Sequence, residues 1–315
     1  MKYQYLFGPI QSRRLGKSLG IDLIPAKTCS LDCIYCECGS TTFLSAERKE
    51  YIPASAIISE LQDFLRDSPV LDFITFGGSG EPTLNSGLGE IVRYLKSGYS
   101  QYKTALLTNG TLFHLSRVRE DCLPFDLVLP SLDAVSSEVF AKINRPDPGL
   151  QAEEIIAGLI EFAHVYHGRI WLEIFIVPGI NDSPDEIARL KEIIPRINPD
   201  RVQLNSLDRP GTEEWVVPAS RKRLEEIAAL LKPLPVEIIA RNQNSASAAG
   251  TADDQIRGKT LAAITRRPCT EQDIAAMAGI SIHDAQEILE DLRRSGLLKT
   301  QEISGNRFFI IARKR

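Results

Sequence analysis

The stretch that decides the fold is residues 19–38, LGIDLIPAKTCSLDCIYCEC. Its first part, Leu19–Ile24, is apolar and rich in branched side chains, as a buried strand is. The rest carries Cys29, Cys33 and Cys36 in the spacing Cys-x3-Cys-x2-Cys, with Cys38 two residues later. Disulfide frameworks spread their cysteines along the chain, so four cysteines within ten residues indicate a bound metal centre instead.

Outside this stretch, short β-branched runs alternate with helical patterns. We expect six strands, at Leu19–Ile24, Phe73–Phe76, Thr104–Leu107, Asp126–Leu129, Ile170–Val177 and Val202–Asn205. Apolar residues at three- and four-residue spacing predict helices over Ser55–Leu65, Leu88–Tyr94, Glu153–Val165, Pro184–Ile194 and Ser220–Leu231. Strands that alternate with helices form a parallel sheet, so the predicted fold class is α/β, a partial (β/α)6 TIM-like barrel over residues 1–240.

The chain changes character after this barrel. Residues 241–253 are small and polar without periodicity, which is typical of a linker. Over residues 254–315 we expect three helices and then two strands that meet at Ser304-Gly305-Asn306, with Thr270 as the cap of the second helix and a turn at Gly279. This order resembles a small winged helix-turn-helix domain.

Length and composition are those of a soluble globular protein, with 315 residues of which 43% are apolar and 25% charged. A net charge of −4 argues against a protein that coats nucleic acid by bulk electrostatics. No stretch approaches the roughly 20 apolar residues that cross a bilayer, and the N-terminus lacks the apolar core of a signal peptide. We therefore expect a cytoplasmic protein without a membrane partner.

The cysteine loop suits an iron–sulfur centre. Three thiolates can hold a four-iron cube, a [4Fe-4S] cluster, and three ligands for four irons leave one iron with an open site. The alternative is a structural zinc site with Cys38 as the fourth ligand, although zinc ribbons and fingers supply their ligands as two separated pairs.

The spacing, the strand before it and Tyr35 ahead of the third cysteine resemble the radical S-adenosylmethionine (SAM) superfamily, over roughly residues 5–240. The resemblance implies that Cys29, Cys33 and Cys36 hold the cluster and that its open iron binds SAM. It also implies reductive cleavage of SAM to methionine and a 5′-deoxyadenosyl radical, which abstracts hydrogen from a substrate. A reductant such as flavodoxin or ferredoxin would supply the electron.

Three further motifs follow successive strands at their carboxyl ends, where barrel sites gather. Residues 77–81, 108–110 and 131–133 resemble the superfamily's Gly-Gly-Glu, Thr-Asn-Gly and Ser-Leu-Asp elements. The resemblance makes these residues candidates for binding SAM, together with Tyr35: Gly78, Gly80, Glu81, Thr108, Asn109, Ser131 and Asp133. A turn or a helix cap is the alternative for each one alone, but their repetition favours one shared site.

The last two strands add four candidates. Glu173 is an acid inside a buried apolar run and needs a partner; the resemblance suggests the ribose hydroxyls of SAM, and a salt bridge within the barrel is the alternative. Val177 and Asn181 belong to a turn similar to the family's Gly-x-Asn-Asp, which implies that Val177 touches adenine. Gln203 and Asn205 share one face of the sixth strand, so one of them, with Asn205 as the candidate, faces the lumen.

The flanking segments favour one branch of the superfamily. Residues 7–9, 12–16, 24–28 and 202–210 resemble iron–sulfur oxidoreductases related to the wybutosine-synthesis enzyme. Those enzymes are expected to carry more cysteines for a second cluster, whereas this chain has Cys38, Cys122 and Cys269 on different elements. That departure argues against tricyclic-base synthesis from pyruvate.

Two side-chain sets concern the substrate. Cations that could form a rim for a substrate carboxylate or phosphate are Arg13, Arg14, Lys27 and Arg209, with solvated surface charges as the alternative. Cys38 is the candidate catalytic residue, as a spare redox-active thiol, a thiol beside the substrate or a hydrogen donor to a radical. The alternative is that Cys38 lies near the site without a role in it.

The winged-helix-like region leaves the substrate open. Its third helix carries Asp284, Glu287, Glu290 and Asp291, acids that phosphate would repel. Residues 254–315 hold eleven Lys and Arg against eight Asp and Glu, a weak signal for binding of tRNA or a peptide and not of a DNA operator. Protein docking, or a lid over the barrel mouth, is the alternative. The function classes that remain are radical modification of tRNA or a peptide, conversion of a small metabolite, activation of a glycyl-radical enzyme, and an iron- or oxygen-sensing iron–sulfur regulator.

Overall fold

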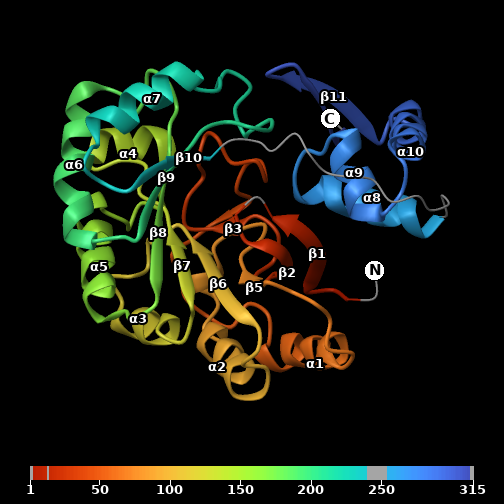
Figure 1. Ribbon diagram of the computed structural model, residues 1–315, viewed down its shortest axis with the longest axis horizontal. Helices are drawn as coiled ribbons and strands as arrows, with labels where there is room; N and C mark the ends of the chain where they lie inside the picture. Colours follow the sequence, from red (N-terminus) through yellow and green to blue (C-terminus); the bar gives the residue numbers. More distant parts are fainter. Residues whose placement is uncertain (1–2, 13, 240–253, 313–315) are drawn as a thin grey trace.

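The computed structural model describes residues 3–12, 14–239 and 254–312. The main sheet consists of β1 Leu6–Ser12, β2 Gly16–Ile21, β5 Phe73–Phe76, β6 Lys103–Thr108, β7 Leu127–Pro130, β8 Arg169–Phe175, β9 Arg201–Asn205 and β10 Val236–Ile238. They lie side by side in that order (Figure 1). β1 is antiparallel to β2, and the later neighbours are all parallel. The predicted α/β class with a partial barrel is confirmed.

Helices cover the outer face of the curved sheet (Figure 1). They are α1 Ala54–Leu65, α2 Leu88–Gly98, α3 Ser116–Cys122, α4 Ser137–Asn144, α5 Ala152–Val165, α6 Pro184–Ile197 and α7 Arg221–Leu230. The start of α6 shows how the sequence fixes such an element, because the Ser183 side chain accepts a hydrogen bond from the Glu186 N–H and Pro184 occupies the first helical position.

All six predicted strands are present, but the sequence missed β1 and β10 at the two edges of the sheet. β1 contains Gly8-Pro9, which interrupts a strand pattern, and an edge strand tolerates proline with an irregular register between Phe7 and Ile10. The bounds of the first predicted strand, Leu19–Ile24, were also wrong. The strand observed there, β2, runs from Gly16 to Ile21 and ends before Leu23 and Ile24, the apolar residues on which the longer prediction rested.

Alternation along the strands separates an outer core from the barrel lumen. On β8, Ile170 and Leu172 belong to the outer core, whereas Trp171 belongs to a lumen cluster with Leu127 and Leu129 of β7. The turn between β1 and β2 inserts Leu15 into the same cluster, where it is 4% exposed. Because β2 runs parallel to the other strands, this turn fills the amino-terminal end of the lumen and leaves the carboxyl ends for a site.

The C-terminal segment, defined here as residues 254–312, contains α8 Asp254–Arg266, α9 Glu271–Ala278, α10 Ile282–Arg294, β11 Leu298–Ile303 and β12 Asn306–Ile311. Thr270 forms a capping box with Asp273, and Gly279, at φ 67°, ends α9. Ser304 and Gly305 both have positive φ in the tight β11–β12 turn. Three helices and a hairpin therefore occur in the predicted order, while the predicted linker, 241–253, lies outside the described residues.

Two short strands remain, β3 Thr28–Cys29 and β4 Phe43–Leu44, which pair with each other at the two ends of the cysteine loop. Across the described ranges, none of the helices has the length and apolarity that spanning a bilayer requires.

Candidate functional site

The cysteine loop lies beyond the carboxyl end of β2 and is fastened to the end of α4. The Asp32 N–H donates to the Asn144 carbonyl at 3.0 Å, and the Ile34 N–H donates to the Ile143 carbonyl at 3.0 Å. Leu31 and Ile34 are buried in an apolar cluster with Ile143. The backbone between the cysteines is thus held by both hydrogen bonds and packing.

Two asparagines from other elements direct amide groups at the cysteine sulfurs. Asn109 Nδ2, just after β6, lies 3.6 Å from Cys29 Sγ, and Asn144 Nδ2 lies 3.3 Å from Cys33 Sγ. An N–H donor stabilises negative charge on sulfur, which is the form that binds metal. These donors therefore suit thiolate ligands better than thiols.

The pKa values of the three thiols differ in the metal-free chain. Burial, with a further contribution from Glu81, raises the pKa of Cys29 to about 12. Burial and Asp133 likewise raise the pKa of Cys33. The hydrogen bond with Cys38 is the main cause that lowers the pKa of Cys36 to about 7, against the effect of burial. Metal binding at Cys29 and Cys33 must therefore release protons.

The donor set fits the cluster that the sequence predicts. Cys29, Cys33 and Cys36 are free cysteines on one loop, each partly accessible. Within the described ranges, no three His, Cys, Asp or Glu side chains converge on a position for a single metal ion. The thiolates that hold a cube bind different irons, so they need not converge in that way.

Gly78 and Gly80 allow the loop after β5 to lie against the cysteine loop. A Cβ on Gly80 would lie 2.0 Å from the Thr28 carbonyl oxygen, and one on Gly78 would lie 1.8 Å from a carboxylate oxygen of Asp22. The Glu81 N–H donates to the same Thr28 oxygen at 3.2 Å. Packing between the two loops thus explains both glycines, and their contact with SAM stays a prediction.

Glu81 is 2% exposed, and its carboxylate accepts four hydrogen bonds from the chain itself. Its donors are the Thr83 N–H and hydroxyl at 2.9 and 2.6 Å, the Thr108 hydroxyl at 2.7 Å and the Asn109 N–H at 2.7 Å. Burial raises its pKa although these hydrogen bonds oppose the shift. Glu81 and Thr108 therefore join β5 to β6 and position Asn109 beside Cys29.

Tyr35 and Asp133 meet in a second buried network. The Tyr35 hydroxyl donates to the Asp133 carboxylate, which also accepts from Asn144 Nδ2 at 2.8 Å and from the Phe175 N–H at 2.8 Å. The Tyr35 ring stacks on Phe175 with centroids 3.8 Å apart. The predicted residues Tyr35 and Asp133 are thus brought together, and Asn144 links them to Cys33.

A cavity of about 40 Å³ lies beside Cys33, between the cysteine loop and the ends of β6 and β7. Ser131, Asn109 and Asn144 supply polar groups to its wall. A space of this size admits a few water molecules. Ser131 therefore borders open space beside Cys33, as do the other predicted contacts Asn109, Tyr35 and Asp133.

Glu173 and Asn205 lie together on the lumen face of β8 and β9. Glu173 forms an ion pair with Arg14, and its Oε1 accepts from Asn205 Nδ2 at 2.5 Å. Arg14 also donates to Gln203 Oε1 at 3.1 Å. The same-face placement of Gln203 and Asn205 is confirmed, and Glu173 forms the salt bridge that was the alternative to ribose binding.

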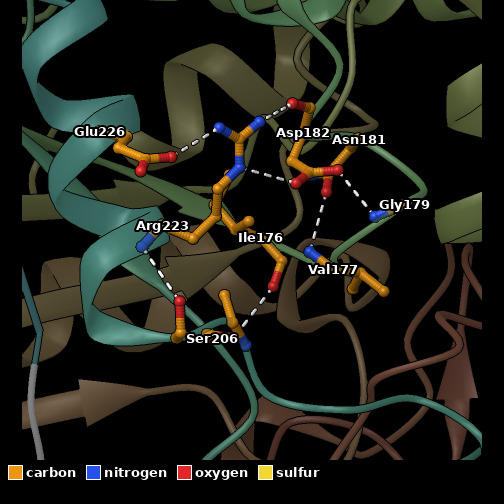
Figure 2. A network of polar contacts seen from close by, with 10 residues as sticks. Ile176, Val177, Gly179, Asn181, Asp182, Ser206, Arg223 and Glu226 are labelled. Atoms are coloured by element: carbon orange, nitrogen blue, oxygen red, sulfur yellow. Dashed lines mark hydrogen bonds and ion pairs between the residues drawn. The ribbon is translucent and has the colours of Figure 1, made fainter.

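Asn181 shapes the turn after β8 instead of offering free polar atoms. Its Oδ1 accepts from the Val177 N–H at 2.8 Å (Figure 2). Its Nδ2 donates to the Phe175 and Asp133 carbonyls. Asp182 secures the turn by accepting from the Gly179 N–H and from Arg223 (Figure 2). Val177 is buried in the apolar cluster under the cysteine loop.

Of the four cations predicted as one rim, the three that the structure describes are not gathered together. Arg14 lies in the lumen with Glu173, whereas Arg209 is 5% exposed and pairs with the C-terminal segment. Lys27 lies in the cysteine loop, and Arg13 is outside the described residues. Charge in a sequence does not reveal burial, so the same role is expected of each cation before the fold is known.

Cys38 lies beside the cluster position. Its Sγ is 3.7 Å from the Gly78 carbonyl oxygen and shares a hydrogen bond with Cys36.

The sequence did not predict Asn144 as a site residue, because an asparagine at a helix end carries no spacing signal. Only the fold of α4 against the loop reveals its part in the site.

The C-terminal segment is joined to both sides of this site. Arg209, after β9, donates to Asp273 at 2.6 and 3.0 Å and to the Pro268 carbonyl at 2.7 Å. On the other side, Arg266 of α8 pairs with Asp22, just after β2, and stacks over the Phe7 ring at 4.4 Å. Figure 1 shows the segment beside β1 and the loop that follows β2.

The hairpin of the segment also reaches the cysteine loop. Ile303, at the end of β11, packs against the apolar cluster that contains Leu31, Ile34 and Val216. Lys299 of β11 lies 3.9 Å from the Glu214 carboxylate. These contacts make the segment a cover for the loop that carries the three cysteines.

Comparison with known proteins then decides the family. Residues 23–190 match the family described as the radical SAM superfamily. This chain belongs to the radical SAM superfamily. The match confirms the recognition made from the cysteine loop and the strand-end motifs, and SAM and a [4Fe-4S] cluster are the cofactors of this family.

Relatives of this radical SAM protein differ in length and name. It is 35% identical over 239 residues to a UPF0026 protein of Methanocaldococcus jannaschii, covering 75% of this chain and 73% of that one. It is 34% identical over 306 residues to a Brachyspira hyodysenteriae protein named GTPase Obg, covering 97% of this chain but only 45% of that protein. A dual-specificity RNA methyltransferase RlmN of Nitratidesulfovibrio vulgaris is 28% identical over 177 residues, 53% of this chain and 47% of that one.

Solved structures support the same fold. A radical SAM methyltransferase from Sphaerobacter thermophilus superposes with a TM-score of 0.55 at 17% identity, over 70% of this chain and 66% of that one. SuiB of Streptococcus suis, bound to SAM, gives a TM-score of 0.50 at 15% identity, over 70% of this chain and 49% of that one.

Proposed function

We propose that this radical SAM protein cleaves SAM reductively and abstracts hydrogen from an organic substrate. The observation that carries the proposal is the loop at the carboxyl edge of the parallel strands that holds Cys29, Cys33 and Cys36. The amide groups of Asn109 and Asn144 point at two of its sulfurs, those of Cys29 and Cys33. When bound, the cluster and SAM supply the one-electron chemistry that yields the 5′-deoxyadenosyl radical.

The chain's own residues would hold the three thiolates and exclude water. Asn109 and Asn144 orient the sulfurs of Cys29 and Cys33, and the buried Glu81 carboxylate fixes the backbone of Asn109. Leu15 closes the amino-terminal end of the lumen, while the C-terminal segment covers the cysteine loop. Exclusion of water protects a reactive intermediate from side reactions.

A small metabolite is the substrate class that we favour. Ile303 and Lys299 of the hairpin are engaged with the main body, so this face of the segment is not free to grip tRNA, a peptide or a DNA operator. Similarity to the RNA methyltransferase covers only 53% of this chain and 47% of that protein. Salt-sensitive binding of tRNA or DNA by the purified protein would instead favour a nucleic-acid substrate or the regulator.

The proposal is tested by anaerobic reconstitution with iron and sulfide, followed by dithionite and SAM, with 5′-deoxyadenosine measured by chromatography. The wild type should form the nucleoside and Cys33→Ala should not. Cys269→Ala, a buried cysteine of the C-terminal segment, is the matched control and should behave as the wild type. Equal nucleoside in Cys33→Ala would overturn the assignment of the cluster to this loop.

A further inference from the structure

Lys27 carries a buried ammonium group that the described protein leaves without a hydrogen-bond partner. Its Nζ is inaccessible to solvent, although the described residues around it offer no acceptor within reach. Removing an ammonium ion from water without a counter-charge costs several kcal/mol. A buried ammonium group of this kind suits a bound anion, and the location of Lys27 in the cysteine loop indicates which one.

The backbone of Lys27 is held rigidly between two loops of the site. Its N–H donates to the Ser79 carbonyl at 2.7 Å, and its own carbonyl accepts from the N–H groups of Thr42 and Phe43 at 3.0 and 3.1 Å. Its φ of 65° is in the left-handed region, which a long side chain rarely adopts and which is costly unless the surroundings impose it. Glycine or asparagine adopts this conformation with less strain.

The ammonium group acts on the third cysteine of the loop. The charge of Lys27 lowers the pKa of Cys36. Its effect is smaller than that of the hydrogen bond with Cys38, which also lowers this pKa, and than that of burial, which raises it. The same charge acts on Cys38. The geometry agrees, because the Lys27 N–H donates to the Ser79 carbonyl while Cys38 Sγ lies 3.7 Å from the neighbouring Gly78 carbonyl oxygen. Lys27 and Cys38 therefore lie against the same loop after β5.

The other charges that act on these sulfurs are negative. Glu81 acts on Cys29, Asp133 on Cys33 and Glu37 on Cys36, and each raises the pKa of its thiol. A four-iron cluster on three thiolates is itself anionic, and reduction adds a further electron. The acids disfavour that added charge, whereas a nearby cation favours it.

We propose that Lys27 is the counter-cation of the cluster, a positioning residue whose ammonium group raises the reduction potential and helps to retain the cluster. The inference rests on the proposed function, because it requires the cluster on Cys29, Cys33 and Cys36. It assigns Lys27 to the cluster itself rather than to a substrate rim. Electrostatics and hydrogen bonds to sulfur are established means by which a protein tunes such a potential.

The test compares Lys27→Met with the wild type, with Lys17→Met as the control because Lys17 is an exposed lysine of β2. EPR-monitored potentiometry of the reconstituted proteins, without substrate, should give a more negative midpoint for Lys27→Met and an unchanged one for Lys17→Met. Lys27→Arg keeps the charge and should restore part of the shift. Equal midpoints in Lys27→Met and the wild type would overturn the inference.

A second readout applies to the apoproteins. Lys27→Met removes the unpartnered ammonium, so its apo form should unfold at a higher temperature than the wild type. The gain in unfolding temperature on loading the cluster should be smaller in Lys27→Met. An unchanged apo unfolding temperature, or a folded Lys27→Met that loses the cluster without rescue by Lys27→Arg, would contradict the inference. Failure of the wild type to load a cluster would contradict the proposed function instead.

Discussion

Arg209 and Asp273 form a two-pronged ion pair between the end of β9 and the start of α9, at 2.6 and 3.0 Å. The Arg209 side chain is 6% exposed and that of Asp273 is 24% exposed. A guanidinium group fits a carboxylate in this geometry better than an ammonium group does. The pair therefore fixes the C-terminal segment against the part of the barrel that carries the site.

We expect Arg209→Met to release this contact. Removing one partner of a largely buried pair should lower the free energy of unfolding by about 3 kcal/mol, and proteolysis within the C-terminal segment should accelerate. Urea unfolding and a proteolysis time course measure the two effects. Arg221→Met, which removes an exposed pair with Glu225, is the control and should change stability little. Equal protease resistance in Arg209→Met would show that other contacts alone hold the segment.

Gly80→Ala should disturb the cysteine loop. The added Cβ would meet the Thr28 carbonyl at 2.0 Å, and backbone on both sides cannot move away without shifting Cys29. We expect a loss of about 3 kcal/mol in stability and a reduced iron content after reconstitution. Gly98→Ala is the matched control, since nothing lies within 4 Å of its Cβ position and alanine favours a helix. Full iron loading of Gly80→Ala would mean that the two loops can separate.

Cys38→Ala separates the cluster from the zinc alternative. If Cys29, Cys33 and Cys36 suffice as ligands, this variant should still bind about four irons per chain, as a cube requires. A zinc site that used Cys38 as fourth ligand would lose its metal. Metal analysis of Cys38→Ala beside Cys36→Ala distinguishes the two, because only Cys36→Ala should lose iron. Zinc at one ion per chain in the wild type would contradict the cluster.

Asp22 predicts a pH dependence of stability. Burial raises the pKa of its carboxyl above the usual 3.8, and the nearby Arg266 only partly offsets this. The folded chain therefore binds this proton more tightly than the unfolded chain, so the stability contributed at this site falls as pH rises above 3.8 and is greatest below it. Relative to Asp22→Asn, the wild type should gain stability as pH falls from neutral toward that value. The free energy of unfolding of both proteins is measured by urea unfolding at several pH values. If the difference between the wild type and Asp22→Asn did not change with pH, the raised pKa of Asp22 would be contradicted.

Much of the site could be predicted because its motifs are local. The spacing of the cysteines and the strand-end position of Asn109 are visible in the sequence, and they lie together in the structure. The roles of Asn144 and Arg14 could not be predicted, since each depends on contacts across more than 100 residues of chain. Gly8-Pro9 concealed β1 for a related reason, because an edge strand forms through pairing with β2 and not through its own pattern.

The hydrogen-bond partners of the acidic residues in the site could not be predicted from the sequence either. Glu81, Asp133 and Glu173 were all expected to contact SAM, but the fold gives each of them protein donors. A buried carboxylate must be satisfied in the folded chain, and a sequence does not reveal which donors will reach it. Their direct contact with SAM stays a prediction.

The central claim is that Cys29, Cys33 and Cys36 hold a cluster with one iron open to SAM. The most direct measurement is the EPR spectrum of the reduced, reconstituted protein before and after addition of SAM. Binding of SAM at the open iron should change the g values of the wild type, and Cys33→Ala should give no cluster signal. A fully loaded wild-type cluster whose spectrum is the same with and without SAM would contradict the account.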